Sequence, residues 1–165
     1  NATPSGNATA ATTLLKLAGF TNELRYVDIP QQALAQMQPM MSQYPLSFGQ
    51  WLQALAKALS KPREIAVIGD PQGADTQALL NVVRKGYRPF LVVALGTPDR
   101  EDVQLAQPRQ LPTNAAHTVC SITAVPLLQD RDLVNGQAAA YVCRDFACQA
   151  PITEQEVLEV QLEHR

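Results

Sequence analysis

The clearest pattern of hydrophobic and polar positions lies at residues 64–96, where two apolar runs flank a segment with helical spacing. Residues 65–68 are continuously apolar, which is typical of a parallel strand covered on both faces. Leu79, Val82 and Val83 then recur on one helix face, and residues 90–95 form the second run. The pattern predicts a strand, a helix and a parallel strand joined by a right-handed crossover.

Two residues mark the ends of the helix in this unit. Asp75 is a predicted N-cap, because its side chain can accept a hydrogen bond from a free backbone amide of the first turn. Gly86 suits the left-handed backbone conformation that follows many helices.

Helical periodicity also runs through residues 1–60 and predicts three helices. The predicted boundary residues are Ser5 as the first cap and Gly19 as the first stop, Pro30 as the second start, Pro39 as a kink or break, and Ser47 as the third cap. The first helix carries small residues suited to close packing. Met and aromatic residues in the other two are expected in the core rather than around a ligand.

Residues 97–136 carry four prolines among polar residues, and their pattern is weak. The pattern allows two elements, a short helix near residues 101–106 and a strand of β-branched residues at 117–125. The pair Asn135 and Gly136 predicts a tight turn, followed by a third strand at residues 138–143. The last predicted element is a C-terminal helix, whose capping box is formed by Thr153 and Glu156.

Together these elements predict an α/β fold, in which a helical segment packs on a small, mainly parallel sheet of three or four strands. The expected division is a helical segment at residues 1–60, an α/β domain at 61–161 and a tail at 162–165. The first residue, Asn1, lies inside a polar run that leads into a helix, and the tail resembles the linker before an expression tag. We therefore expect a piece of a longer protein.

Composition narrows the classes of partner. The 165 residues are 46% hydrophobic and 17% charged, with a formal net charge of -2, and the basic residues form no run. Nucleic acid and anionic membranes are therefore disfavoured as partners. No apolar run is long enough to span a membrane and no signal peptide is apparent, so a cytoplasmic location is expected. Three cysteines do not indicate a secreted disulfide framework.

The turn at residues 69–73 lies where a phosphate could bind, between a strand and a helix N-terminus. It matches neither the dinucleotide nor the P-loop pattern, and Asp70 stands where a phosphate would approach. We expect a structural turn and assign no nucleotide cofactor.

Cysteine spacing leaves three interpretations open. Cys143 and Cys148 are separated by four residues, unlike the C-x-x-C of thioredoxin-like centres. With His117 and Cys120 they could form a tetrahedral zinc set. Buried thiols without a ligand are favoured over zinc, and a local disulfide between Cys143 and Cys148 stands between the two, so no metal is assigned.

Catalytic pairs are not evident in the sequence. The histidines are His117 and His164, and neither a nucleophile elbow nor a zinc-protease motif occurs. The acidic pairs are expected at solvated helix starts, where they favour the helix dipole, and consist of Glu101 with Asp102 and Glu154 with Glu156.

Three stretches resemble one family. They are T-P-S-G-N-A at residues 3–8 leading into L-L-K-L-A at 14–18, E-I-A-V-I-G-D-P at 64–71 with D-T-Q-A-L-L at 75–80, and A-Y-V-C-R-D-F-A-C-Q-A-P-I-T at 140–153. They look like the C-terminal region of the large thioredoxin-domain proteins, which include the spermatogenesis-associated thioredoxin-like protein and bacterial relatives. The resemblance does not extend over about residues 97–125.

The resemblance implies a thioredoxin-like domain, then an (α/α)6 toroid similar to N-acylglucosamine 2-epimerase and six-hairpin glycosidases, then a terminal α/β segment. Ser5, Gly6 and Asn7 match a motif at a toroid helix start, which implies either a sugar-sized pocket or plain capping by Ser5. The residues that match the terminal motif, to which no role is assigned, are Tyr141, Cys143, Phe146, Cys148 and Pro151.

These observations lead to two hypotheses about function. The first is a structural and interaction module without catalytic activity of its own, whose partners are the remaining domains of the full-length chain. The alternative is part of the substrate pocket of a toroid enzyme acting in carbohydrate metabolism. No oligomeric state is assigned.

Overall fold

The computed structural model describes residues 5–60, 62–98 and 125–163. Its fold is α/β, as predicted. The elements, in chain order, are α1 Gly6–Thr21, α2 Arg25–Gln43, η1 Pro45–Ser47, α3 Gly49–Leu59, β1 Arg63–Ile68, α4 Ala74–Arg84, β2 Leu91–Gly96, η2 Pro126–Leu128, β3 Ala139–Arg144, β4 Ala147–Cys148 and α5 Gln155–Glu163. None of the helices in these described ranges is long and apolar enough to cross a membrane.

The four strands form one sheet in the order β2, β1, β3, β4. β1 and β2 run parallel, which confirms the predicted strand, helix and strand unit. β3 lies antiparallel to the other edge of β1, and β4 returns antiparallel to β3. The sheet is therefore mixed rather than mainly parallel, because β3 and β4 both pair in the antiparallel direction.

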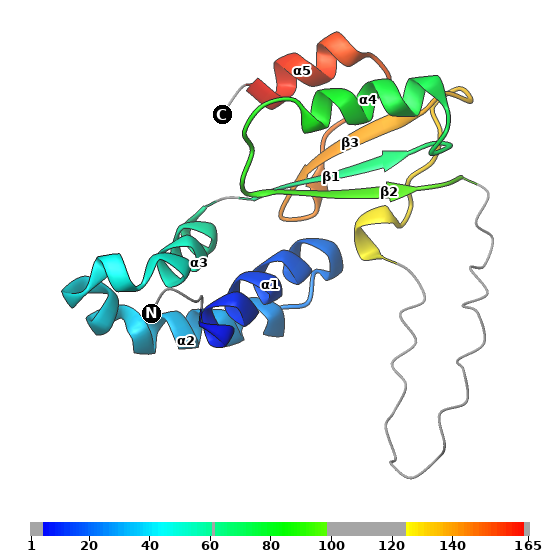
Figure 1. Cartoon of the computed structure of the whole chain (residues 1–165). Coiled ribbons are helices and arrows are strands. Elements are labelled where there is room, and N and C mark those ends of the chain that lie inside the picture. Colours follow the sequence, from blue (N-terminus) through cyan, green and yellow to red (C-terminus); the bar gives the residue numbers. More distant parts are fainter. Residues whose placement is uncertain (1–4, 61, 99–124, 164–165) are drawn as a thin grey trace, which may run out of the picture.

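Helices cover both faces of the sheet (Figure 1). α4 and α5 lie on one face, where Ile65, Val67 and Leu79 belong to a buried cluster that also includes Leu158. On the other face Ala66, Val92 and Cys143 belong to a second cluster, which contacts Phe20 at the end of α1 and includes Leu127 of η2. Burial on both faces explains why the strand at residues 65–68 is continuously apolar.

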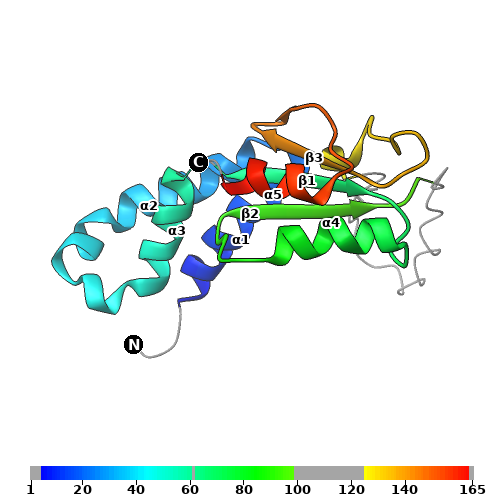
Figure 2. The ribbon, with the colours of Figure 1, turned by 90° about the horizontal axis from the view of Figure 1, so that it is seen from above.

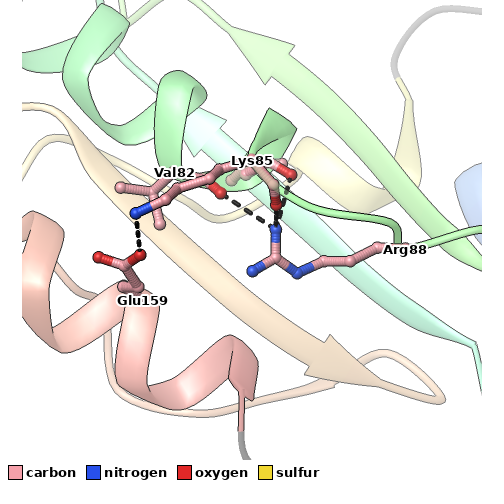
Figure 3. Close-up of polar contacts among 5 residues, drawn as sticks. Val82, Lys85, Arg88 and Glu159 are labelled. Carbon is pink, nitrogen blue, oxygen red and sulfur yellow. Dashed lines mark hydrogen bonds and ion pairs between the residues drawn. The ribbon is translucent and has the colours of Figure 1, made fainter.

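Polar contacts fix the C-terminal end of α4 (Figure 3). Lys85 Nζ lies 2.5 Å from Glu159 Oε1 of α5, and this contact raises the pKa of Lys85. The Arg88 guanidinium donates hydrogen bonds to the carbonyls of Val82, Val83 and Lys85. The Val82 carbonyl also accepts a hydrogen bond from the Lys85 amide at 3.2 Å, and Arg88 adds further donors for the carbonyls at the C-terminal end of α4. Gly86 adopts φ 81°, the predicted left-handed conformation.

α2 and α3 lie to one side of the sheet, whereas the C-terminal end of α1 contacts it, and the three helices have a core of their own (Figure 2). This core includes Ala8, Ala11, Leu34, Met41 and Trp51, which confirms that the Met and aromatic positions are core. Ala8 and Ala11 of α1 are 0% and 3% exposed, in agreement with the close packing expected of this small-residue helix.

Several predicted helix boundaries are wrong. Gly19 lies inside α1, which continues to Thr21 and ends at left-handed Asn22. A Cβ atom at Gly19 would lie 2.8 Å from Val92 Cγ2, so glycine allows the helix to approach β2. α2 begins before Pro30 and is not divided at Pro39, while the kink predicted at Pro39 stays a prediction. The Pro30 ring is fully buried, so tertiary packing compensates for the missing backbone donor.

The predicted caps also differ from the observed ones. Ser47 lies in η1, and α3 is preceded by Phe48. Gly73 precedes α4, and Asp75 lies inside its first turn. Asp75 instead accepts hydrogen bonds from the amides of Thr76 and Ala138, both at 2.8 Å, and these bonds lower its pKa.

Near the C-terminus the predicted turn at Asn135 and Gly136 is present, whereas α5 begins later than predicted. Asn135 and Gly136 both have positive φ, which confirms the predicted tight turn. α5 begins at Gln155, two residues after Thr153, so the predicted capping box is displaced. Leu162 belongs to α5 and is buried, although the predicted boundary preceded it. The predicted helix at residues 101–106 and the predicted strand at 117–125, apart from Val125, lie outside the described residues.

Candidate functional site: a disulfide hairpin beside a buried carboxyl

The hairpin of β3 and β4 carries four of the five residues singled out from the terminal motif, Tyr141, Cys143, Phe146 and Cys148. Cys143 and Cys148 are directly opposite each other in the ladder and form a disulfide, with Cα atoms 3.9 Å apart. The unliganded thiol favoured for Cys143 is therefore wrong, and the local disulfide is the alternative that the structure supports. Asp145 and Phe146 make the two-residue turn with φ 50° and 62°. Two positive φ angles allow this tight hairpin, but a bulky residue such as Phe146 rarely adopts one.

The two sulfur atoms differ in their access to solvent. Cys143 is 1% exposed in the cluster with Ala66 and Val92, whereas Cys148 is exposed on the edge strand. A molecule arriving from solvent can therefore reach Cys148 but not Cys143.

A guanidinium group contacts both sulfurs. Arg131 Nη2 lies 2.7 Å from Cys148 Sγ and 3.6 Å from Cys143 Sγ. Arg131 Nη1 donates to the Gln129 carbonyl, and the guanidinium lies over the Tyr141 ring at 5.8 Å. A positive charge held at a sulfur favours the thiolate over the thiol.

Tyr141, another motif residue, holds the segment that presents Arg131. Its hydroxyl donates to the Asp132 carbonyl at 2.8 Å and accepts from the Asp132 amide at 3.3 Å. Tyr141 therefore has a positioning role. Pro151, the last motif residue, is exposed and precedes Ile152, which pairs with Ala140.

Glu64 is a buried acid beside the disulfide. It is directly opposite Cys143 in the β1 and β3 ladder and lies on the same face as Ala66, with 2% of its surface exposed. Its Oε2 atom has no hydrogen-bond partner within the described part of the chain. Burial raises the pKa of Glu64 to about 6, and the nearby Asp145 carboxylate adds to the increase, while the Phe146 amide opposes it.

A cavity of about 340 Å³ opens beside Glu64, between the helices and the hairpin. It is lined by the C-terminal half of α1, the end of α3 and the turn at Asp145 and Phe146. Lys57 also lines it and is 5% exposed, and its Nζ atom has no hydrogen-bond partner among the residues that the structure describes. Burial lowers the pKa of Lys57, and the charge of Lys16 lowers it further.

Ser5, Gly6 and Asn7 lie at the N-terminal end of α1, whereas the cavity is lined by the C-terminal half of this helix. All three are exposed, and the Ser5 side chain makes no capping hydrogen bond. Plain side-chain capping by Ser5 is therefore not observed. The structure does not bring these residues together with the motif at the hairpin.

The turn at residues 69–73 packs against protein instead of leaving room for a phosphate. A Cβ atom at Gly69 would lie 2.2 Å from Thr76 Oγ1 and 2.8 Å from Ala138 Cβ. The amides of Gln72 and Gly73 donate to Asp70 at 2.9 and 2.8 Å. These contacts support a structural role for the turn.

The zinc set could not use Cys143 and Cys148 as thiolates while they form the disulfide. Its other members, His117 and Cys120, lie outside the described residues. Within the described ranges, no group of three or more metal-ligating side chains is present.

Three residues of this site were missed by sequence reasoning: Glu64, Lys57 and Arg131. Glu64 carried a signal, since a charged residue that extends a strand buried on both faces is itself expected to be buried. Lys57 and Arg131 carried none, because their neighbours are distant in sequence.

Comparison with known proteins shows similarity to spermatogenesis-associated protein 20. The chain is 31% identical to the human protein and 28% identical to both the rat and mouse proteins, over 153 residues that make up 93% of this chain. The chain spans only 17% of the length of these relatives. No model of a protein family matches it, and no solved structure does. The chain is thus similar to one segment of a larger protein.

Proposed function

We propose that this chain is a structural and interaction module of a longer protein, and that α1, α2 and α3 dock on other domains of that protein. The proposal rests on where large apolar side chains are exposed. Eight of the twelve such side chains in the described residues lie on these helices or their connections: Leu17, Leu24, Ile29, Met40, Tyr44, Leu46, Leu52 and Leu59.

The exposure is large where the helices connect or end. Leu46 is 100% exposed, Leu59 76% and Leu24 73%. Exposed apolar surface of this kind marks interaction sites, because its removal from water is favourable at about 25 cal/mol per Å². The small share of each relative that this chain spans supports other segments of the same protein as the partner.

We further propose that those segments comprise a thioredoxin-like domain and an (α/α)6 toroid, of which α1, α2 and α3 are the last helices. A cytoplasmic location is part of the same proposal.

The test is binding of this chain to the preceding segment of the longer protein, produced separately. We expect a stable complex by titration calorimetry. Leu46→Ser is expected to weaken it roughly tenfold, because a fully exposed leucine that becomes buried is a typical interface anchor.

Tyr87→Ser is the matched control, because Tyr87 is 90% exposed but lies in the turn between α4 and β2. We expect this variant to bind as tightly as the native chain. Equal losses in both variants, or no complex at all, would contradict the docking proposal.

A pocket for a carbohydrate is the second proposed function. It is supported by the exposure of Ser5, Gly6 and Asn7 and by a Ser5 hydroxyl that forms no capping bond. The pocket would form where α1 begins, between this chain and the rest of a toroid enzyme. The expected result is loss of sugar turnover in the full-length protein with Asn7→Ala, and turnover that survives the substitution counts against this function.

A further inference from the structure

We propose that Cys143 and Cys148 form a thiol–disulfide exchange site, at which a thiol from solution attacks Cys148 while Arg131 and Glu64 assist the two sulfurs. The proposal does not depend on the docking function. It rests on the different surroundings of the two cysteines.

A purely stabilising role accounts poorly for this disulfide. It joins residues only five apart, and a loop this short restrains the unfolded chain less than a longer one would. The same two residues are already paired in the ladder of the hairpin. The cytoplasmic location proposed above adds a reason on which this step rests, because disulfides that form in reducing compartments are usually catalytic or redox-sensing.

Access decides which sulfur is attacked. Exchange requires an incoming thiolate to reach a sulfur atom of the disulfide. Cys148 is exposed and Cys143 is 1% exposed, so attack falls on Cys148 and Cys143 leaves. Arg131 Nη2 lies 2.7 Å from Cys148 Sγ and favours the thiolate of Cys148 once it is released.

The leaving sulfur of Cys143 forms among apolar side chains, where a thiolate is unfavourable. Glu64 lies directly opposite on the same face of the sheet, and no described residue forms a hydrogen bond with its Oε2 atom. A carboxyl with a pKa of about 6 is partly protonated near neutral pH and can supply a proton. Other charged groups at its cavity are Asp145 of the hairpin and Lys57 of α3, while α1 contributes uncharged side chains.

A dithiol in solution reduces the disulfide of Cys143 and Cys148 in two steps. One thiolate of the dithiol forms a bond to Cys148 Sγ, the disulfide bond breaks, and Cys143 leaves with the electron pair and takes the Glu64 proton. The second thiol of the dithiol loses its proton to solvent and attacks the first sulfur of the same dithiol molecule, which is bonded to Cys148 Sγ. This attack releases the Cys148 thiolate. The chain gains two electrons, the dithiol becomes a disulfide, and solvent reprotonates Glu64.

The first experiment compares Cys143→Ser with Cys148→Ser, each treated with oxidised glutathione. Peptide mass spectrometry distinguishes the remaining cysteine from Cys120. We expect Cys148 in the first variant to form a mixed disulfide at least about tenfold faster than Cys143 in the second, since thiolate fraction and access both favour it. Equal rates, or a faster reaction of Cys143, overturn the proposal. Glu64 is present in both variants, so the comparison tests the two cysteines alone.

The second experiment tests Arg131 in the Cys143→Ser background. Arg131→Gln is expected to shift the pH at which Cys148 becomes reactive toward iodoacetamide to a higher value, and Arg131→Lys is expected to restore it in part. Arg25→Gln is the matched control, because Arg25 also lies over a tyrosine ring, that of Tyr26, but contacts no cysteine in the described structure. An unchanged profile with Arg131→Gln contradicts the role of this guanidinium.

The third experiment follows reduction of the disulfide by dithiothreitol, with the rate divided by the concentration of its thiolate. The native chain should show a rate that falls as pH rises through about 6, because Glu64 loses its proton there. Glu64→Gln should be roughly tenfold slower at low pH and show no such fall. A fall that persists in Glu64→Gln rules out Glu64 as the proton donor.

Discussion

Glu64 illustrates how the surroundings of one residue become a property of the whole fold. Burial raises its pKa from an ordinary value of 4.5 to about 6, so the folded chain binds the proton more tightly than the unfolded chain. The protonated Glu64 carboxyl makes its full contribution to the unfolding free energy below about pH 4.5. This contribution is lost as the pH rises through about 6 and the carboxyl ionises. Its ionisation therefore costs about 2 kcal/mol of unfolding free energy at pH 8.

We predict that Glu64→Gln removes this pH dependence, because the amide cannot ionise. The difference in unfolding free energy between Glu64→Gln and the native chain should favour the variant by about 2 kcal/mol more at pH 8 than at pH 4. Urea denaturation of the oxidised chain at both values measures it. Glu156→Gln, at an exposed position of α5, should show little change, and a difference that is constant with pH for Glu64→Gln would contradict the prediction.

Prediction from sequence reaches its limit at residues whose role depends on distant partners. The motif around Cys143 and Cys148 was visible, but the register that places Glu64 opposite Cys143 was not. Arg131 lies in a segment with weak patterning, and only the fold brings it to the sulfurs. Pairing register and loop position are tertiary properties, so local periodicity carries no information about them.

At the scale of whole elements, the contact of α1 with β2 depends on Gly19. A methyl group there would gain about 1 kcal/mol of helix propensity but would press on the stiff, β-branched Val92 side chain at 2.8 Å. Overpacking of this kind costs about 1–3 kcal/mol, so the unfavourable term is larger. We predict that Gly19→Ala destabilises the chain by roughly 1 kcal/mol in thermal or urea unfolding.

Two comparisons isolate the steric cause. In a Val92→Ala background the clash is relieved, so Gly19→Ala should become neutral or stabilising by up to about 1 kcal/mol. Gly49→Ala, at a helix position with nothing within 4 Å of the added atom, should not destabilise the native chain. The same loss for Gly19→Ala in both backgrounds would show that contact with Val92 is not the reason.

Elements with a strong local pattern were predictable, and their assembly was less so. The run at residues 65–68 and the stripe of Leu79, Val82 and Val83 predicted β1 and α4 because strand and helix periods differ locally. The antiparallel direction of β3 could not be predicted, since either direction buries the same apolar residues. The prediction that α2 starts at Pro30 was wrong, because burial of the proline ring outweighs the preference of proline for the first turn of a helix.

At the scale of the molecule, the helices and the sheet have separate buried clusters. Ala8, Leu34 and Trp51 belong to the helical cluster, whereas Ile65 and Leu80 belong to the cluster beneath α4 and α5. Among the described residues the helical cluster has six buried members and the cluster beneath α4 and α5 has twelve, so less apolar surface is removed from water in the helical cluster. Segments with less buried apolar surface open at lower free energy.

We therefore predict that the isolated chain loses its helical cluster before its sheet. Trp51 is the one tryptophan of the sequence and is 5% exposed, so its fluorescence reports the helical cluster alone. Amide exchange in β1, followed by mass spectrometry, reports the sheet. The urea midpoint from Trp51 should lie about 0.5 M or more below that from β1.

A matched pair of leucines separates the two clusters further. Leu34 and Leu80 are each 4% exposed, and either change to alanine should cost about 2–5 kcal/mol because it leaves a cavity. Leu34→Ala should lower the Trp51 midpoint while leaving most protection of β1 in place. Leu80→Ala should lower the protection of β1 directly, because its cavity lies beneath α4. If the two probes instead give one shared midpoint in the native chain and in both variants, the helices and the sheet unfold as a single cooperative unit, and α1, α2 and α3 need no further partner to be stable.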